Sequence, residues 1–153
     1  MSTFDPSQFL DFTTTDANST ERVPCPPGEY DAQVEKLETR TWTSKTDPTK
    51  SGVTLEVTWS IQDQTVLQQL DKDKVTVKQG VMLDFTDTGS LDMGKGKNIG
   101  LGRLRAATGN NVPGRPFAPS MLMGCMAKVR VSHEPSKDDP SVVYDRVTAV
   151  APM

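Results

Sequence analysis

The stretch VTLEVTWSI, residues 53–61, alternates between apolar and polar side chains without a break. Because successive side chains of a β-strand point to opposite faces, this alternation predicts a strand with one buried face. The residues on that face are Val53, Leu55, Val57, Trp59 and Ile61. The sequence therefore predicts a β-protein with Trp59 in its core.

The stretches on either side of 53–61 also have strand patterns. Residues 28–42 alternate in the same way, and their apolar phase slips at Leu37, which predicts a β-bulge. The turn-rich residues 43–52 predict a hairpin loop. Residues 75–85 predict a third strand, in which Gly80 marks a bulge or a bend.

The C-terminal half adds one helix and two strands. Residues 97–108 predict a short helix that stops at Gly109. Residues 121–134 and 141–150 alternate again and predict the last two strands. The order is three strands, a helix and two strands, which favours a five-stranded Greek-key barrel of the OB type over residues 28–153. A β-sandwich or an α+β sheet would give the same order of elements.

Residues 1–27 have a different composition and predict an appendage to this domain. Asp5 and Pro6 have the residue types of a helix N-cap and a first helical position. The stretch after them is polar and ends in a proline-rich turn. The first twelve residues combine aromatic and acidic side chains, which favours residues 4–12 as a segment that docks onto a partner protein, such as a replication or recombination protein, or masks the domain itself. A helix packed on the barrel or a disordered leader is the alternative.

The chain has 153 residues, which is long enough for one domain with a sizeable core, and its net charge is −3. It has no apolar stretch of the roughly 20 residues that a membrane span needs, and no secretory signal pattern. The spacing of Cys25 and Cys125 does not fit a metal site. We therefore expect free thiols and a cytoplasmic protein without a membrane partner, with a single disulfide between the two cysteines as the alternative.

The charges are distributed unevenly. Residues 1–29 carry five carboxylates against one arginine, whereas residues 91–130 carry seven basic residues against Asp92 alone. Such a local excess of positive charge favours a polyanionic partner despite the negative total. An ordinary solvated basic face is the alternative.

The sequence contains no recognisable catalytic motif. The glycines at 94, 96, 100 and 102 match neither a P-loop nor a dinucleotide-binding turn. His133 is the only histidine, so a zinc site of the common kinds cannot be assembled. We expect a protein without catalytic residues, metal or cofactor.

Single-strand binding needs a basic groove and aromatic faces on which bases stack. Trp42 ends the predicted strand 28–42, lies near Arg40 and Lys45 and has no obvious core to join, which leaves a stacking role and a packing role equally open. Lys36 and Arg40 share a parity on one predicted strand, as do Lys128 and Arg130 on another, so one basic stripe can cross both. The predicted nucleic-acid site comprises Lys36, Arg40, Trp42, Lys45, Lys95, Lys97, Arg103, Phe117, Lys128, Arg130 and Tyr144.

The chain resembles a group of phage and prophage single-stranded DNA-binding proteins with an OB fold. The resemblance covers residues 26–150 and rests on the segments PPGEYDAQVEKLE, GVTLEVTWSI, KNIGLGRLRAATG, LMGCMAKVRVSHE and YDRVTAV, in that order. It implies a role in phage replication, recombination or repair, in the cytoplasm of a bacterial host. Two features depart from the group: the chain ends in AVAPM and not in an acidic tail, and the predicted loop EPSKDDP at residues 134–140 carries two aspartates.

These observations favour non-specific binding of single-stranded DNA by a non-enzymatic protein. The alternative is a protein-interaction or virion-structural β-domain whose basic residues have no nucleic-acid role. The sequence leaves open whether the chain forms a homo-oligomer.

Overall fold

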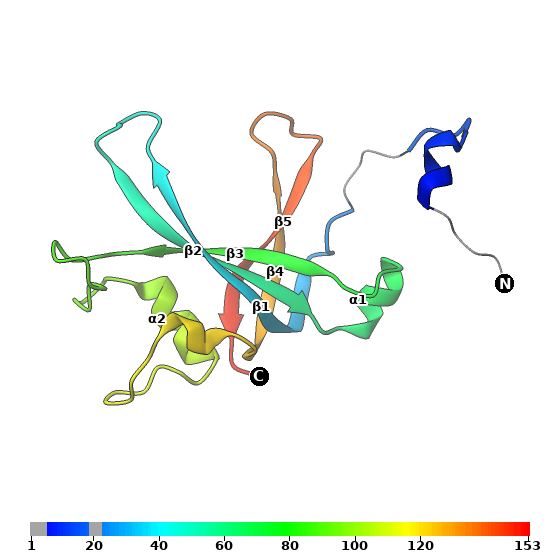
Figure 1. Cartoon of the computed structure of the whole chain (residues 1–153). Helices are drawn as coiled ribbons and strands as arrows, with labels where there is room; N and C mark the ends of the chain where they lie inside the picture. Colours follow the sequence, from blue (N-terminus) through cyan, green and yellow to red (C-terminus); the bar gives the residue numbers. More distant parts are fainter. Residues whose placement is uncertain (1–5, 19–22) are drawn as a thin grey trace.

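The computed structural model describes residues 6–18 and 23–153 and shows a mostly β protein (Figure 1). Five strands form one antiparallel sheet in the order β3-β2-β1-β4-β5. The strands are β1 (Gly28–Thr43), β2 (Ser51–Ile61), β3 (Thr76–Leu83), β4 (Met126–Pro135) and β5 (Val143–Ala151). The helical segments are η1 (Pro6–Asp11), α1 (Gln64–Gln69), α2 (Ile99–Ala107) and η2 (Pro119–Leu122).

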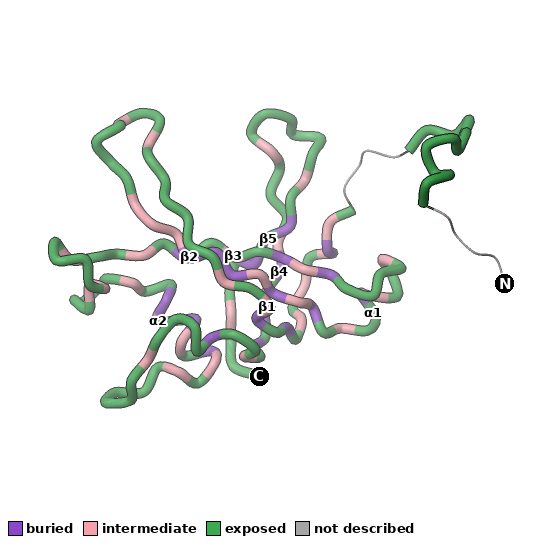
Figure 2. Tube along the Cα trace, viewed as in Figure 1, coloured by how far each residue is buried: buried purple, intermediate pink, exposed green. Residues whose placement is uncertain are grey.

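The alternation in β2 defines the inner face of the sheet, as the sequence predicts. Leu55, Val57, Trp59 and Ile61 are buried, and Trp59 is 0% exposed. The indole N–H of Trp59 donates a hydrogen bond to Oε1 of Gln79 on β3, at 2.9 Å. The polar group of the largest core side chain is therefore satisfied. The buried positions gather in the middle of the sheet, where the strands cross (Figure 2).

The predicted bulge in β1 is confirmed. The register between β1 and β2 shifts between Val34 and Lys36. The first part of β1, from Gly28 to Gln33, pairs with β4, while the strand beyond the bulge pairs with β2 alone. A bulge bends a strand and increases its twist, which lets one long strand serve two neighbours. The predicted irregularity at Gly80 is wrong, because Gly80 pairs with Glu56 in an unbroken ladder.

The sheet is open, so the predicted barrel is not closed. β3 and β5 are the two edge strands, and no ladder of hydrogen bonds joins them. Their Cα atoms nevertheless approach within 8 Å, and α2 packs against both. Closure depends on strand tilt and stagger, and the alternation of side chains specifies neither of these.

Helix α2 forms where the sequence predicts it. Leu101, Leu104 and Ala107 are its buried residues, and Gly109 follows with a φ of +78°, the left-handed conformation that ends a helix. Before the helix, Asn98 closes the loop 84–98 by binding the backbone of Asp84 in both directions, with Oδ1 accepting at 2.8 Å and Nδ2 donating at 2.8 Å.

The residues immediately before β1 pack on the domain. Cys25 is 1% exposed, and its N–H donates to Oδ2 of Asp145 on β5 at 2.7 Å. Nε2 of His133 lies 2.6 Å from the Cys25 carbonyl oxygen. Both cysteines are free thiols. Burial, and then the Asp145 carboxylate, raise the pKa of Cys25 to about 11, so its sulfur is an unreactive core atom.

The N-terminal segment differs from this docked stretch. Residues 6–11 form the short helix η1, which has no buried residue. The rings of Phe9 and Phe12 stack at a centroid distance of 6.2 Å. Asp5, the predicted N-cap, lies outside the described residues.

Candidate nucleic-acid interface

Two hairpins project from the sheet on the same side, leaving a gap between them (Figure 1). One is the end of β1 with the start of β2, and the other is the end of β4 with the start of β5. The face of β1, β2 and β3 that lies opposite the core continues into the first hairpin, and we call this surface the outer face.

Trp42 lies on the outer face near the end of β1. It is 36% exposed, and its cross-strand partner is Gly52. A Cβ atom added to Gly52 would lie 2.6 Å from the indole Nε1, so the ring occupies the space that the glycine leaves empty. The missing side chain of Gly52 therefore lets the indole lie close against the backbone of β2.

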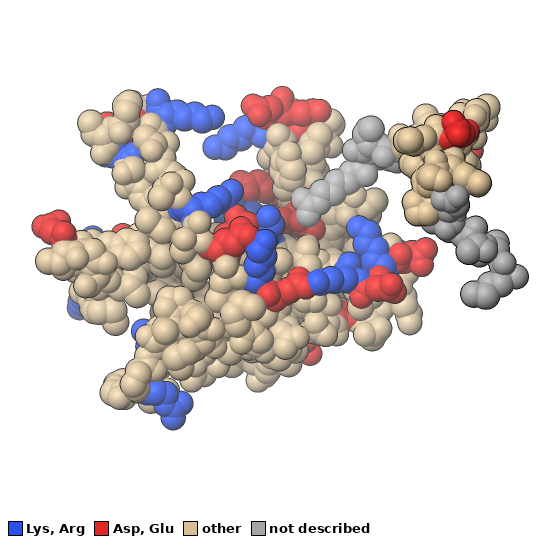
Figure 3. All heavy atoms as spheres, viewed as in Figure 1, with Lys and Arg blue, Asp and Glu red and all other residues tan. Residues whose placement is uncertain are grey.

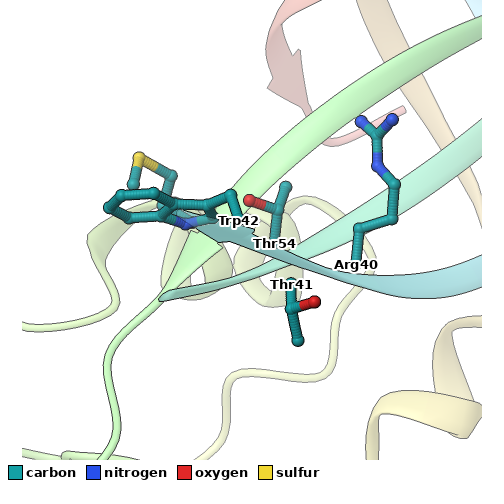
Figure 4. Close-up of a pocket in the computed structure, with 5 residues that line it drawn as sticks. Arg40, Thr41, Trp42 and Thr54 are labelled. Carbon is teal, nitrogen blue, oxygen red and sulfur yellow. The ribbon is translucent and has the colours of Figure 1, made fainter. Parts of the chain in front are cut away.

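A shallow hollow of about 410 Å³ adjoins the indole. Its lining comprises Arg40, Thr41, Trp42, Thr54 and Met82, from all three strands, and includes no carboxylate. Figure 4 shows Trp42, Thr54 and Arg40 pointing to the same side of the sheet, whereas Thr41 points away. The hollow thus combines an aromatic face with a guanidinium, the two groups that a stacked base and its phosphate require.

Sequence reasoning missed Met82 and Thr54 as members of this hollow. Met82 is 62% exposed on β3 and lies opposite Thr54 in the ladder. The signal that would find it is register, because Met82, Thr54 and Arg40 occupy one row across the three strands. An isolated apolar residue in an edge strand gives no such indication.

Arg40 belongs to an ion cluster centred on Glu56. The guanidinium of Arg40 lies 2.8 Å from one carboxylate oxygen, and Nζ of Lys78 lies 3.0 Å from the other. The Glu56 side chain is 8% exposed, whereas those of Arg40 and Lys78 are 69% and 67% exposed. The carboxylate therefore sits beneath two cations whose charged ends face the solvent.

Lys36 continues the outer face along β1 and is paired with Glu38 at 2.6 Å. The hydrogen bond and charge of Lys36 hold the pKa of Glu38 below its usual value. The same pair raises the pKa of Lys36, so both groups stay charged at neutral pH.

The tip of the first hairpin carries unpaired positive charge. Within the described chain, neither Lys45 nor Lys50 forms an ion pair. The loop is ordered by Asp47, whose Oδ1 accepts hydrogen bonds from the N–H and the hydroxyl of Thr49. Lys50 was absent from the predicted site and lies at the same tip as Lys45.

The predicted cations of β4 lie beside the first part of β1. Lys128 is opposite Asp31 in the ladder, and Arg130 is opposite Glu29. The Arg130 guanidinium lies 2.8 Å from a Glu29 oxygen, and this hydrogen bond holds the pKa of Glu29 below its usual value. Carboxylates therefore alternate with the cations along the stripe that the sequence predicts. Figure 3 shows basic and acidic side chains mixed on the face in view.

The remaining predicted residues are spread over four regions. Lys95 and Lys97 are exposed in the loop 84–98, outside the Trp42 hollow. Tyr144, 48% exposed, is on the second hairpin opposite Glu134. Phe117 packs against the core, and the guanidinium of Arg105 lies 4.1 Å from the centre of its ring. These contacts hold the loop 108–118 on the domain.

Arg103 is exposed on α2 and lines a second hollow, between β3, α2 and β5. In the part of the chain that the structure describes, no helix has the length and apolar character of a membrane span. Over the same residues, no three His, Cys, Asp or Glu side chains gather in a way that would hold a metal ion.

Neither a scan of protein-family models nor a search of curated proteins finds a match for this chain.

Proposed function

We propose that the protein binds single-stranded DNA non-specifically through the outer face and the first hairpin. The observation that carries the proposal is the position of Trp42, a half-exposed indole at the edge of a hollow that contains Arg40 and no carboxylate. We propose that the protein protects or presents single strands during phage replication, recombination or repair, in the cytoplasm of a bacterial host.

The chemistry of this surface supports binding without sequence preference. Every base has a π-face, so stacking on an indole contributes about 1–3 kcal/mol whatever the base. Arg40, Lys78, Lys45 and Lys50 offer positive charge to a phosphate backbone around that platform. None of these groups is arranged to read the edge of a particular base.

The strand order supports an OB-type assignment of the fold. In OB folds, the face of strands 2 and 3 and the loops 1–2 and 4–5 bind oligonucleotides. With the order β3-β2-β1-β4-β5, the proposed fold would have the Trp42 hollow on that face and the two hairpins as those loops.

Fluorescence anisotropy of a labelled oligothymidine tests the proposed function, with a labelled duplex as the control. We expect salt-sensitive binding of the single strand and much weaker binding of the duplex. Trp42→Ala should weaken single-strand binding by about 5-fold or more. Phe85→Ala is the matched control, since Phe85 is 44% exposed but does not line the hollow. Equal losses in both variants would contradict the proposal.

A protein-interaction or virion-structural domain is the second candidate. It is favoured by the pairing of Lys36, Arg40 and Arg130 with carboxylates, which reduces the positive charge that a polyanion would meet. An absence of oligothymidine binding at low salt would make this candidate the better one.

We also propose that the N-terminal segment docks onto replication or recombination proteins. Phe9 and Phe12 are 64% and 69% exposed, and η1 buries none of its residues. Cys25 belongs to the core, so a truncation that tests the docking role of the N-terminal segment must end before Cys25. Removal of residues 1–18 should leave DNA affinity unchanged and abolish capture of the host replication protein. Unchanged capture would exclude the segment as a docking site.

A further inference from the structure

The gap between the two edge strands forms a second hollow, of about 330 Å³. β3 and β5 form its walls, and the first turns of α2 close one side. Among the residues that the structure describes, two that line it are cationic, Arg103 of α2 and Arg146 of β5, and none carries a carboxylate. An anion can therefore enter this hollow without meeting a negative charge in its lining.

The second hollow adjoins the first. Met82 lines both, so the route from the Trp42 indole to the two arginines passes over this one exposed side chain. Gly80, the next residue on the same face of β3, also lines the second hollow and offers no side chain to obstruct the route. The two hollows thus form one track that crosses the edge of the sheet.

The arginines keep hydrogen-bonding capacity for a ligand. Arg103 is exposed and forms no ion pair with any residue that the structure describes. Arg146 contacts Glu134 at 2.7 Å through Nη1, and its side chain is 52% exposed. A guanidinium carries five N–H donors in a fork that matches phosphate geometry, so one such contact leaves the others free.

We propose that this second hollow is a phosphate-binding subsite for the same single strand, with Arg103 and Arg146 holding its backbone. The inference rests on the proposed function and deepens it, because it gives the strand a path. From the stacked base at Trp42 the strand passes over Met82 and leaves the outer face between β3 and β5. The open edge of the sheet is then part of the binding site.

The salt dependence of oligothymidine binding tests the subsite. We expect Arg103→Gln with Arg146→Gln to lower the slope of log affinity against log salt by about 0.7 for each lost phosphate contact. Affinity for a strand of about 16 nucleotides should fall about 10-fold or more, while a strand of about 4, which fits the Trp42 hollow alone, should lose little. Arg115→Gln is the matched control, being an exposed arginine outside both hollows.

A steric variant tests the path without changing charge. A Cβ atom at Gly80 would meet only the Thr54 methyl at 3.6 Å, an ordinary contact, so Gly80→Ala should fold normally. Gly80→Leu should obstruct the track and weaken binding of the long strand while leaving that of the short one. Circular dichroism and thermal melting check that both variants remain folded.

The outcomes separate this inference from the function on which it rests. Failure of the unaltered protein to bind either strand overturns the proposed function and the subsite with it. Binding that responds to Trp42→Ala, with the double arginine variant no weaker than Arg115→Gln, overturns the subsite alone. Equal losses for long and short strands also overturn it, because they would indicate a single shared site.

Discussion

The two tryptophans of this protein lie on opposite faces of the same sheet and have opposite environments. Trp59 points inward, is 0% exposed and donates its N–H to Gln79. Trp42 points outward, is 36% exposed and rests against the backbone at Gly52. The inner indole has its packing and its hydrogen bond supplied by the fold, whereas the outer one keeps an exposed apolar face.

This difference separates residues that hold the fold from residues available for binding. Exposed large apolar side chains are common singly, but one beside a hollow with a free guanidinium N–H is a candidate contact for a ligand. The outer face carries ion pairs such as that of Arg40 with Glu56, whereas the inner face of β2 is lined by buried apolar side chains. Stability should therefore respond to changes at Trp59, and ligand affinity to changes around Trp42.

The largest expected effect is on stability, from Trp59→Ala. Removing a buried tryptophan costs about 3–5 kcal/mol of unfolding free energy, a large share of a domain's total. Urea unfolding followed by circular dichroism measures this loss. Trp42→Ala, as the outer counterpart, should cost less than about 1 kcal/mol. Similar losses for the two variants would contradict the division between the faces.

A smaller effect is expected when the outer indole is displaced and not removed. In Gly52→Ala, the new Cβ would lie 2.6 Å from the indole, so the ring must swing away from the strand. We expect affinity for oligothymidine to fall about 5-fold, as part of the stacking contribution is lost. Quenching of fluorescence by acrylamide should rise at the same time. Unchanged affinity with increased quenching would show that the position of the ring has no importance.

Glu56→Gln tests how the ion pairs of the outer face affect binding. The substitution removes the negative charge beneath Arg40 and Lys78, whose charged ends stay exposed to water. We expect the salt slope of DNA binding to steepen by about 0.7, one additional phosphate contact. The stability cost should be about 1–3 kcal/mol, more than for an exposed ion pair, because the Glu56 side chain is 8% exposed. Weaker binding with an unchanged slope would argue that Glu56 is needed to position the two cations.

The smallest effect concerns the reactivity of the two thiols, because Cys25 is buried whereas Cys125 is only partly buried. In the native protein, Cys125 should react with a thiol reagent at about pH 8 and Cys25 should not. The pKa of Cys25 is raised from 9.0 to about 11 by burial, so the folded state keeps a proton that the unfolded state loses earlier. Its contribution to stability is therefore complete below pH 9.0 and decreases as the pH rises toward 11. Reaction of two thiols in the native state would contradict the burial of Cys25.

The inner face was predictable from sequence because period-two alternation depends only on local chain geometry. The alternation identified the strand around Trp59 and, through the phase slip at Leu37, a bulge in β1, and Gly109 marked the end of the helix before it. The open edge between β3 and β5 was not predictable in this way, since closure depends on tilt and stagger. Cys25 was assigned to an appendage because its hydrogen-bond partner, Asp145, lies 120 residues further along the chain, and local sequence patterns do not indicate such a contact.

The candidate site was predictable only in its individual members. Trp42 and Arg40 were identified by their types and their place at a strand end, and the structure puts both at one hollow. The partners of these residues depend on register, which a single sequence did not specify. Met82 enters the hollow through that register, and Glu56 reaches Arg40 by the same pairing.

Intrinsic tryptophan fluorescence, titrated with unlabelled oligothymidine, tests the central claim most directly. Trp59 is buried and hydrogen-bonded, so a change on binding reports on Trp42. The account predicts strong quenching that weakens with salt, little change with a duplex, and loss of the signal in Trp42→Phe. Quenching that persists in Trp42→Phe, or an oligothymidine that binds without altering Trp42 emission, would contradict the placement of the single strand on this indole.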